Sequence, residues 1–267
     1  MQAASLPATA GWHWARDGFR LFMRQPLPLF AWALFISLMV LFATYTPPVG
    51  PLFFVALMPV VTLVTLSACK HIEADRTMLP SMWLKPLLKP GVFKKLMIMG
   101  LSYAVLCLLA GLLAFMPFAS ALTDGIRAAS VTQDLTPFLM AVRGPLLVFA
   151  TLYVIIAAMF WHAPVLVAWH GVRLGQSLFF SGIACWRNKW AFLVYGLTWV
   201  AAFLAISYCS DLLVALGLPK QMVGILQIPV NIVAGGVLYS SFYPAYTSVF
   251  NINNASLQFD DGERTEA

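Results

Sequence analysis

Long apolar stretches alternate with shorter polar ones along the whole chain. Most of these stretches run for roughly 20 residues or more, which is the length of a helix that crosses the hydrocarbon core of a bilayer. Only helices and closed barrels satisfy their own backbone hydrogen bonds in lipid, so the pattern predicts membrane-spanning helices. The six expected spans cover about 27–45, 51–68, 96–118, 145–169, 189–210 and 225–250.

Composition supports a membrane protein. Hydrophobic residues make up 61% of the chain and charged residues only 10%, against about 25% charged in soluble proteins. A water-soluble fold cannot bury so much apolar surface. We therefore predict an all-α, polytopic membrane protein with one integral domain over residues 1–250. Residues 1–11 are expected to form a loose tail, and the acidic segment 251–267 a disordered one.

Three of the polar connections are basic and aromatic. Residues 12–24 place arginines every fourth position on one side of a helix, with aromatic residues on another, which is typical of an amphipathic helix lying at the bilayer surface. The alternative is an ordinary basic lead-in to the first span. We expect interfacial helices on this side, with lipid headgroups contacted by Arg16, Arg20, Arg24, Lys94, Lys95, Arg187 and Lys189.

The distribution of charge indicates an orientation. Thirteen lysines and arginines fall on the side of the two termini and three on the opposite side. By the positive-inside rule, both termini should be cytoplasmic. The net charge of +6 is too dispersed between apolar runs to indicate nucleic acid. Anionic membrane lipids are the partner that this charge suits, and a homo-oligomer remains open.

Prolines recur in the second, fourth and sixth spans, at Pro59, Pro164 and Pro244. A proline removes one helical hydrogen bond, so each is expected to bend its helix. Their shared place predicts three copies of one unit, made of a surface helix, an outward span and an inward span that contains proline.

Candidate chemistry is sparse. The expected spans hold no Asp, Glu, Lys or Arg well inside them, and the four cysteines form no metal-binding or redox spacing. We therefore predict no catalytic residue, no metal site and no cofactor. His162, Asn231 and Tyr243 are the polar residues that could line a cavity between spans.

The segments GWHWARDGFRLFMRQPLPLF and SGIACWRNKWAFLVYG, together with the threefold pattern, resemble an uncharacterised family of proteobacterial six-helix inner-membrane proteins. That family is distantly similar to the membrane domain of some glycerophosphoryl diester phosphodiesterases. The resemblance implies six helices and an inner-membrane location. It supplies no catalytic residues, and the soluble phosphodiesterase domain has no counterpart in this chain.

Three functions compete. The first is a non-enzymatic inner-membrane protein that acts through lipid or protein contacts in envelope homeostasis. The second is a transporter or permease for a lipid-like or small neutral substrate. The third, a membrane enzyme, has no visible catalytic constellation to support it. A cavity lined by the three polar candidates favours transport, and a tightly packed centre favours the first function.

Overall fold

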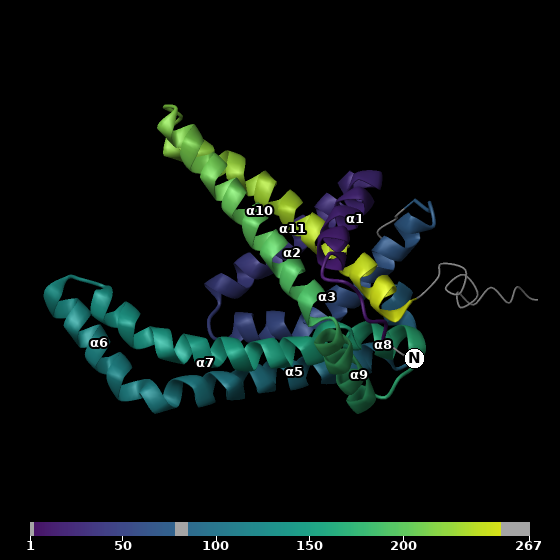
Figure 1. Cartoon of the computed structure of the whole chain (residues 1–267), viewed down its shortest axis with the longest axis horizontal. Helices are drawn as coiled ribbons and strands as arrows, with labels where there is room; N and C mark the ends of the chain where they lie inside the picture. Colours follow the sequence, from purple (N-terminus) through teal and green to yellow (C-terminus); the bar gives the residue numbers. More distant parts are fainter. Residues whose placement is uncertain (1–2, 78–84, 252–267) are drawn as a thin grey trace, which may run out of the picture.

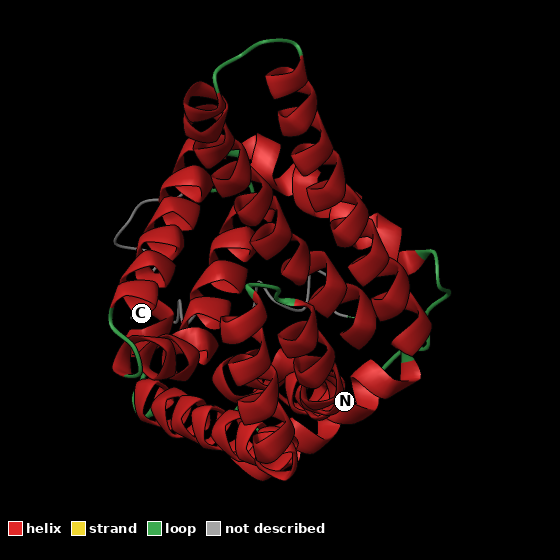
Figure 2. Cartoon of the chain, turned by 90° about the vertical axis from the view of Figure 1, so that its left-hand side faces the viewer, coloured by secondary structure: helices red, strands yellow, loops and turns green. Residues whose placement is uncertain are grey.

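The computed structural model describes residues 3–77 and 85–251. Throughout these two ranges the regular structure is helical, with no strand, and loops occupy the N-terminal residues 3–9 and the connections between helices (Figure 2). Six helical segments are long and apolar enough to cross a membrane. The predicted all-α, six-span class is confirmed.

The helices match the expected spans and extend several of them. The short helices α1 and α9 precede the first and fifth spans at Ala10–Arg24 and Leu174–Arg187. The fourth span is divided in two by a break at His162. The spanning segments are α2 (Pro26–Tyr45), α3 (Val49–Glu73), α5 with η1 and α6 (Val92–Phe115, Met116–Phe118 and Ala119–Thr132), α7 with α8 (Thr136–Trp161 and Ala163–His170), α10 (Lys189–Ala215) and α11 (Lys220–Phe250).

The spans form three helix hairpins that diverge from a common base (Figure 1). The pair α10–α11 extends to the upper left of the view, and α5–α6–α7 extends to the left. The pair α2–α3 makes a shorter hairpin, while α8 and α9 lie at the base. The tips of all three hairpins therefore lie away from the end at which the N-terminus is placed.

A buried cluster joins the hairpins at their base, and we call it the hub. It draws apolar side chains from seven helices. Aromatic rings fill much of it, with Trp14 in edge contact with Tyr195 and Trp161 tilted against Phe242. Its members include Trp14, Leu21, Phe22, Leu66, Ile72, Val165, Leu166, Ala184, Ala191, Tyr195, Val237, Tyr243, Tyr246 and Val249.

Helix α1 is part of the hub. Glycines allow this contact: a Cβ on Gly11 would lie 2.1 Å from the Ala191 carbonyl oxygen, and one on Gly18 would lie 2.5 Å from the Ser241 Cα. Trp14 anchors the helix further by donating from Nε1 to the Ser248 hydroxyl at 2.7 Å. The amphipathic helix expected at the bilayer surface thus turns one face to the α10 and α11 backbones.

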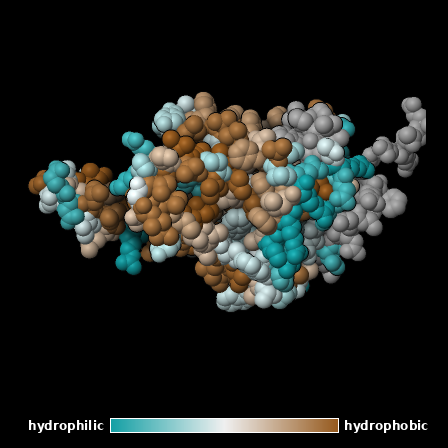
Figure 3. Space-filling view, turned by 90° about the horizontal axis from the view of Figure 1, so that it is seen from above, coloured by the Kyte–Doolittle hydropathy of each residue, from teal (hydrophilic) through white to brown (hydrophobic). Residues whose placement is uncertain are grey.

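Beyond the hub the hairpins are largely exposed. Helix α10 buries only Ala191 and Tyr195, both at its hub end. Hydrophobic residues cover much of the face seen in Figure 3, and hydrophilic ones gather at the far left tip and toward the right. A surface this apolar requires lipid around it.

The N-terminal segment differs from the expected loose tail. The Asn188 side chain accepts from the Leu6 amide and donates to the Ala4 carbonyl, each at 2.9 Å. The Ala4 amide also donates to the Val249 carbonyl at 2.7 Å. The loose-tail prediction was wrong because a buried amide far along the sequence pairs with this backbone. The acidic tail 252–267 lies outside the described residues.

The polar connection at 119–143 is mostly helical. Asp134 lies two residues before α7, where its carboxylate accepts from the amide of Thr136 at 2.9 Å and from its hydroxyl at 2.7 Å. These hydrogen bonds hold the pKa of Asp134 below its usual range.

Candidate functional site

The helix break at His162 is built around a serine from another helix. The Ser181 hydroxyl of α9 accepts from the His162 amide at 2.9 Å and donates to the Ala158 carbonyl at 2.8 Å. These two backbone groups normally bond each other in an α-helix. Ser181 is therefore inserted into the helical ladder, one of the recognised causes of a kink, and it satisfies both groups.

The His162 side chain is enclosed by aromatic rings. It is only 2% exposed, and its ring centroid lies 5.2 Å from Phe250, 5.7 Å from Tyr246 and 6.0 Å from Phe192. Its Nε2 atom has no hydrogen-bond partner among the described residues. The packing leaves His162 as a tightly held member of the hub.

The three polar candidates do not converge. Tyr243 is 1% exposed within the hub, and its neighbour in the cluster, Tyr246, is fully buried. Asn231 lies twelve residues before Tyr243 on α11 and is exposed, which places it about 18 Å away along the helix axis. His162 and Tyr243 thus belong to one packed core, and Asn231 belongs to the hairpin that extends from it.

Two residues near this core were missed from the sequence. Glu73 ends α3, close enough to Tyr243 to interact with it electrostatically, and its Oε2 atom is buried without a hydrogen-bond partner among the described residues. His170 Nε2 lies 2.9 Å from the Tyr246 hydroxyl. Both stand at the ends of apolar runs, where sequence alone places them in connecting loops rather than against the core.

The three prolines occupy different settings. Pro164 lies at the start of α8 and Pro244 in the last two turns of α11, whereas Pro59 lies near the middle of α3. Pro244 removes the usual donor to the Ser240 carbonyl, which instead accepts from the Cys69 thiol at 3.9 Å. The threefold repeat therefore stays a prediction.

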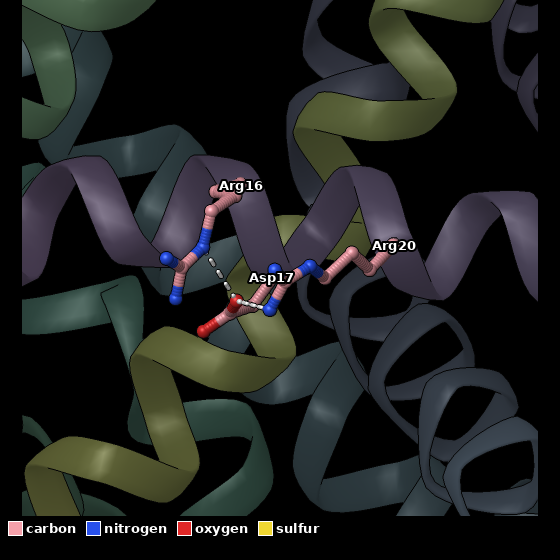
Figure 4. A network of polar contacts seen from close by, with 3 residues as sticks. All are labelled: Arg16, Asp17 and Arg20. Atoms are coloured by element: carbon pink, nitrogen blue, oxygen red, sulfur yellow. Dashed lines mark hydrogen bonds and ion pairs between the residues drawn. The ribbon is translucent and has the colours of Figure 1, made fainter.

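The arginines of α1 are partly neutralised (Figure 4). Asp17 lies between Arg16 and Arg20 and contacts them at 3.1 and 3.4 Å. Arg24 lies 3.6 Å from Asp75 at the end of α3. All three arginine side chains are about half exposed or more, so these exposed pairs weaken, rather than remove, the attraction of this face for anions.

The junction of α9 and α10 carries two cations between two tryptophans, and we call it the elbow. It consists of Trp186, Arg187, Lys189 and Trp190. The Lys189 ammonium lies 4.7 Å from the Trp186 ring and 5.8 Å from the Trp190 ring. These indoles are 72% and 63% exposed. No ion pair of Arg187 or Lys189 occurs within residues 3–77 and 85–251.

Helix α9 presents two contrasting faces next to the elbow. Its buried face consists of small residues, Ser177, Ser181, Ala184 and Cys185. Its outer face carries the exposed side chains of Phe179, Ile183 and Trp186.

Lys94 and Lys95, at the start of α5, are likewise exposed, beside the exposed Phe93. An apolar face bordered by cations suits the boundary between acyl chains and headgroups.

No group of three or more His, Cys, Asp or Glu side chains able to hold a metal ion occurs in the part of the chain that the structure describes.

A comparison with known proteins finds a relative. The chain is 33% identical over 263 residues to a probable inner membrane protein of Burkholderia thailandensis, and the match covers 94% of this chain and 95% of the other. No protein-family model matches the chain. No solved structure matches it significantly.

Proposed function

Because the chain belongs to the family of this Burkholderia protein, we propose that it is a multi-pass inner-membrane protein whose hub faces the cytoplasm. It acts through contacts with lipids or proteins in envelope homeostasis rather than by catalysis. The concentration of lysine and arginine on the hub side supports this orientation.

The elbow is the observation that carries the proposal. It combines exposed indoles with two cations that have no carboxylate partner in the described ranges. Indole rings favour the headgroup region of a bilayer. Each basic residue near an anionic membrane contributes about 1 kcal/mol of attraction. The elbow therefore suits phosphate-bearing anionic lipids of the cytoplasmic leaflet.

The packed centre supports this function over transport. His162 and Tyr243 lie within the hub with almost no exposed surface, and Asn231 lies outside it. A substrate path lined by these three residues needs them around one cavity. Their separation instead favours a rigid base that holds three lipid-exposed hairpins.

The test is lipid retention by the full chain, measured by native mass spectrometry after reconstitution with phosphatidylglycerol or phosphatidylcholine. The Arg187→Gln/Lys189→Gln variant should retain phosphatidylglycerol about fivefold less for each charge removed. Retention of phosphatidylcholine should change little, because its headgroup carries no net charge.

The matched control is Arg127→Gln/Arg143→Gln, which removes two exposed cations on the opposite side of the six spans. This control should keep the wild-type preference for phosphatidylglycerol. Equal loss in both variants would show that the elbow has no special role. Substrate flux through wild-type liposomes would favour the transporter instead.

A further inference from the structure

Three amide side chains lie on the outward half of α11, away from the hub: Gln221 near its outer end, and Gln227 and Asn231 further in. Gln227 and Asn231 are one turn apart and share a face. Asn231 lies about 16 Å along the axis from Lys220, where α11 begins. The hydrocarbon core is about 30 Å thick, so Asn231 falls near its middle.

Neither the Gln227 nor the Asn231 amide is satisfied within residues 3–77 and 85–251. Asn231 is exposed and Gln227 is half-buried, and no side-chain hydrogen bond of either occurs in the described ranges. Pro229 lies between them and deprives the Ile225 carbonyl of its helical donor. Ile225 is itself 68% exposed. Unpaired polar groups in hydrocarbon cost several kcal/mol each, so this face needs a polar partner.

Glycines border the same face. Gly224 precedes Asn231 by seven residues and Gly235 follows it by four, and a Cβ at either would meet no atom within 4 Å. Elsewhere, Gly11, Gly18 and Gly236 lie against a neighbouring helix so closely that a Cβ would clash. Glycine within a helix costs up to about 1 kcal/mol relative to alanine, and close approach of a second helix compensates for that cost.

We propose that the face of α11 formed by Gly224, Gln227, Asn231 and Gly235 is the interface with a second copy of this chain. An amide both donates and accepts hydrogen bonds, so Asn231 and Gln227 complement the same residues of a twofold-related copy. Such amides are known to hold membrane helices together, and the glycines allow the backbones to approach. This homodimer goes beyond the proposed lipid contacts and does not depend on them.

Lipid does not supply hydrogen-bond partners for the amides of this face. Acyl chains provide neither donor nor acceptor, and headgroups lie about 15 Å from the middle of the bilayer. The neighbouring α10 buries only its two hub-end residues, so the chain covers this hairpin little itself. A second copy brings matched amides at the same depth, which an unrelated apolar helix lacks.

The experiment measures self-association of the full chain in liposomes, by energy transfer between donor-labelled and acceptor-labelled protein across a range of protein-to-lipid ratios. Wild-type protein should associate as a dimer. Asn231→Leu should weaken dimerisation about tenfold, the effect of one interhelical polar contact. Gly235→Ile should weaken it at least as much, because the added side chain points into open space in the monomer and separates the two helices.

Two controls isolate this face. Gly175→Ile adds the same bulk at a helical position of α9 that is equally open, and Gln221→Leu removes an amide near the outer end of α11. Both should dimerise like the wild type. A monomeric wild-type protein at all ratios would overturn the interface, as would equal effects of Gly235→Ile and Gly175→Ile. Lipid retention at the elbow is measured separately, so either proposal can fail alone.

Discussion

Ser181 replaces a backbone partner at the α7–α8 break, where its hydroxyl bridges the Ala158 carbonyl and the His162 amide. Replacing it by alanine leaves both buried groups unpaired, and each such loss costs about 1–3 kcal/mol. We expect Ser181→Ala to lower the thermal midpoint of the protein in detergent.

The control for this prediction is Ser130→Ala, because that exposed hydroxyl bonds only the carbonyl of Arg127 on its own helix. It should leave the midpoint nearly unchanged. Equal stability of Ser181→Ala and wild type would contradict the bridging role of Ser181.

Cys185 offers a chemical probe of the same packed region. Burial raises the pKa of its thiol to about 12, and the thiolate is the form that reacts with alkylating reagents. In the folded protein at pH 8 we expect Cys185 to resist a maleimide, and to react rapidly after denaturation. Mass mapping of the modified peptide measures both rates, and similar rates in the two states would contradict the burial.

At the residue scale, the sequence singles out His162 and Tyr243 as polar residues within the spans. It does not predict which residues they contact. Ser181 and Asn188 contact backbone groups 19 to 184 positions away. Such pairings depend on how helices cross, and no local pattern records them. Glu73 was missed for another reason, because α3 continues past the end of its apolar run.

Elements were predicted more closely than their contacts, because an apolar run of sufficient length specifies a helix in lipid. All six spans were found, with boundaries that differ mainly where helices continue past the predicted ends of the spans. The packing of α1 against α10 and α11 was not predicted. Its periodicity separates an apolar face from a basic one, and an apolar face packs equally well against lipid or protein.

The glycines of α1 supply the test at this scale. Gly18→Ala places a Cβ 2.5 Å from the Ser241 Cα, so the two helices must separate. Overpacking of this kind costs about 1–3 kcal/mol. We expect a lower thermal midpoint and faster proteolysis near residues 3–9, while Gly175→Ala, which meets no neighbour, changes neither. Matching behaviour of the two variants would show that α1 is not held by the hub.

For the whole molecule, three lipid-exposed hairpins joined at one hub give the chain two unlike ends. The hub end carries the elbow and most of the basic residues, and the opposite end carries the hairpin tips. Lipid binding at the elbow and dimerisation through α11 both require that these ends face opposite sides of the membrane. Composition and charge predict this polarity, whereas the divergence of the hairpins depends on tertiary packing.

Topology is therefore the most direct measurement of the central claim. Single cysteines at Thr132, beside the α6–α7 tip, and at Arg187, in the elbow, are introduced into a chain whose four native cysteines are replaced. An impermeant thiol reagent is then added to intact cells. We predict labelling at position 132 from outside, and labelling at position 187 only after the membrane is opened. Labelling at 187 in intact cells, with 132 protected, would contradict the account.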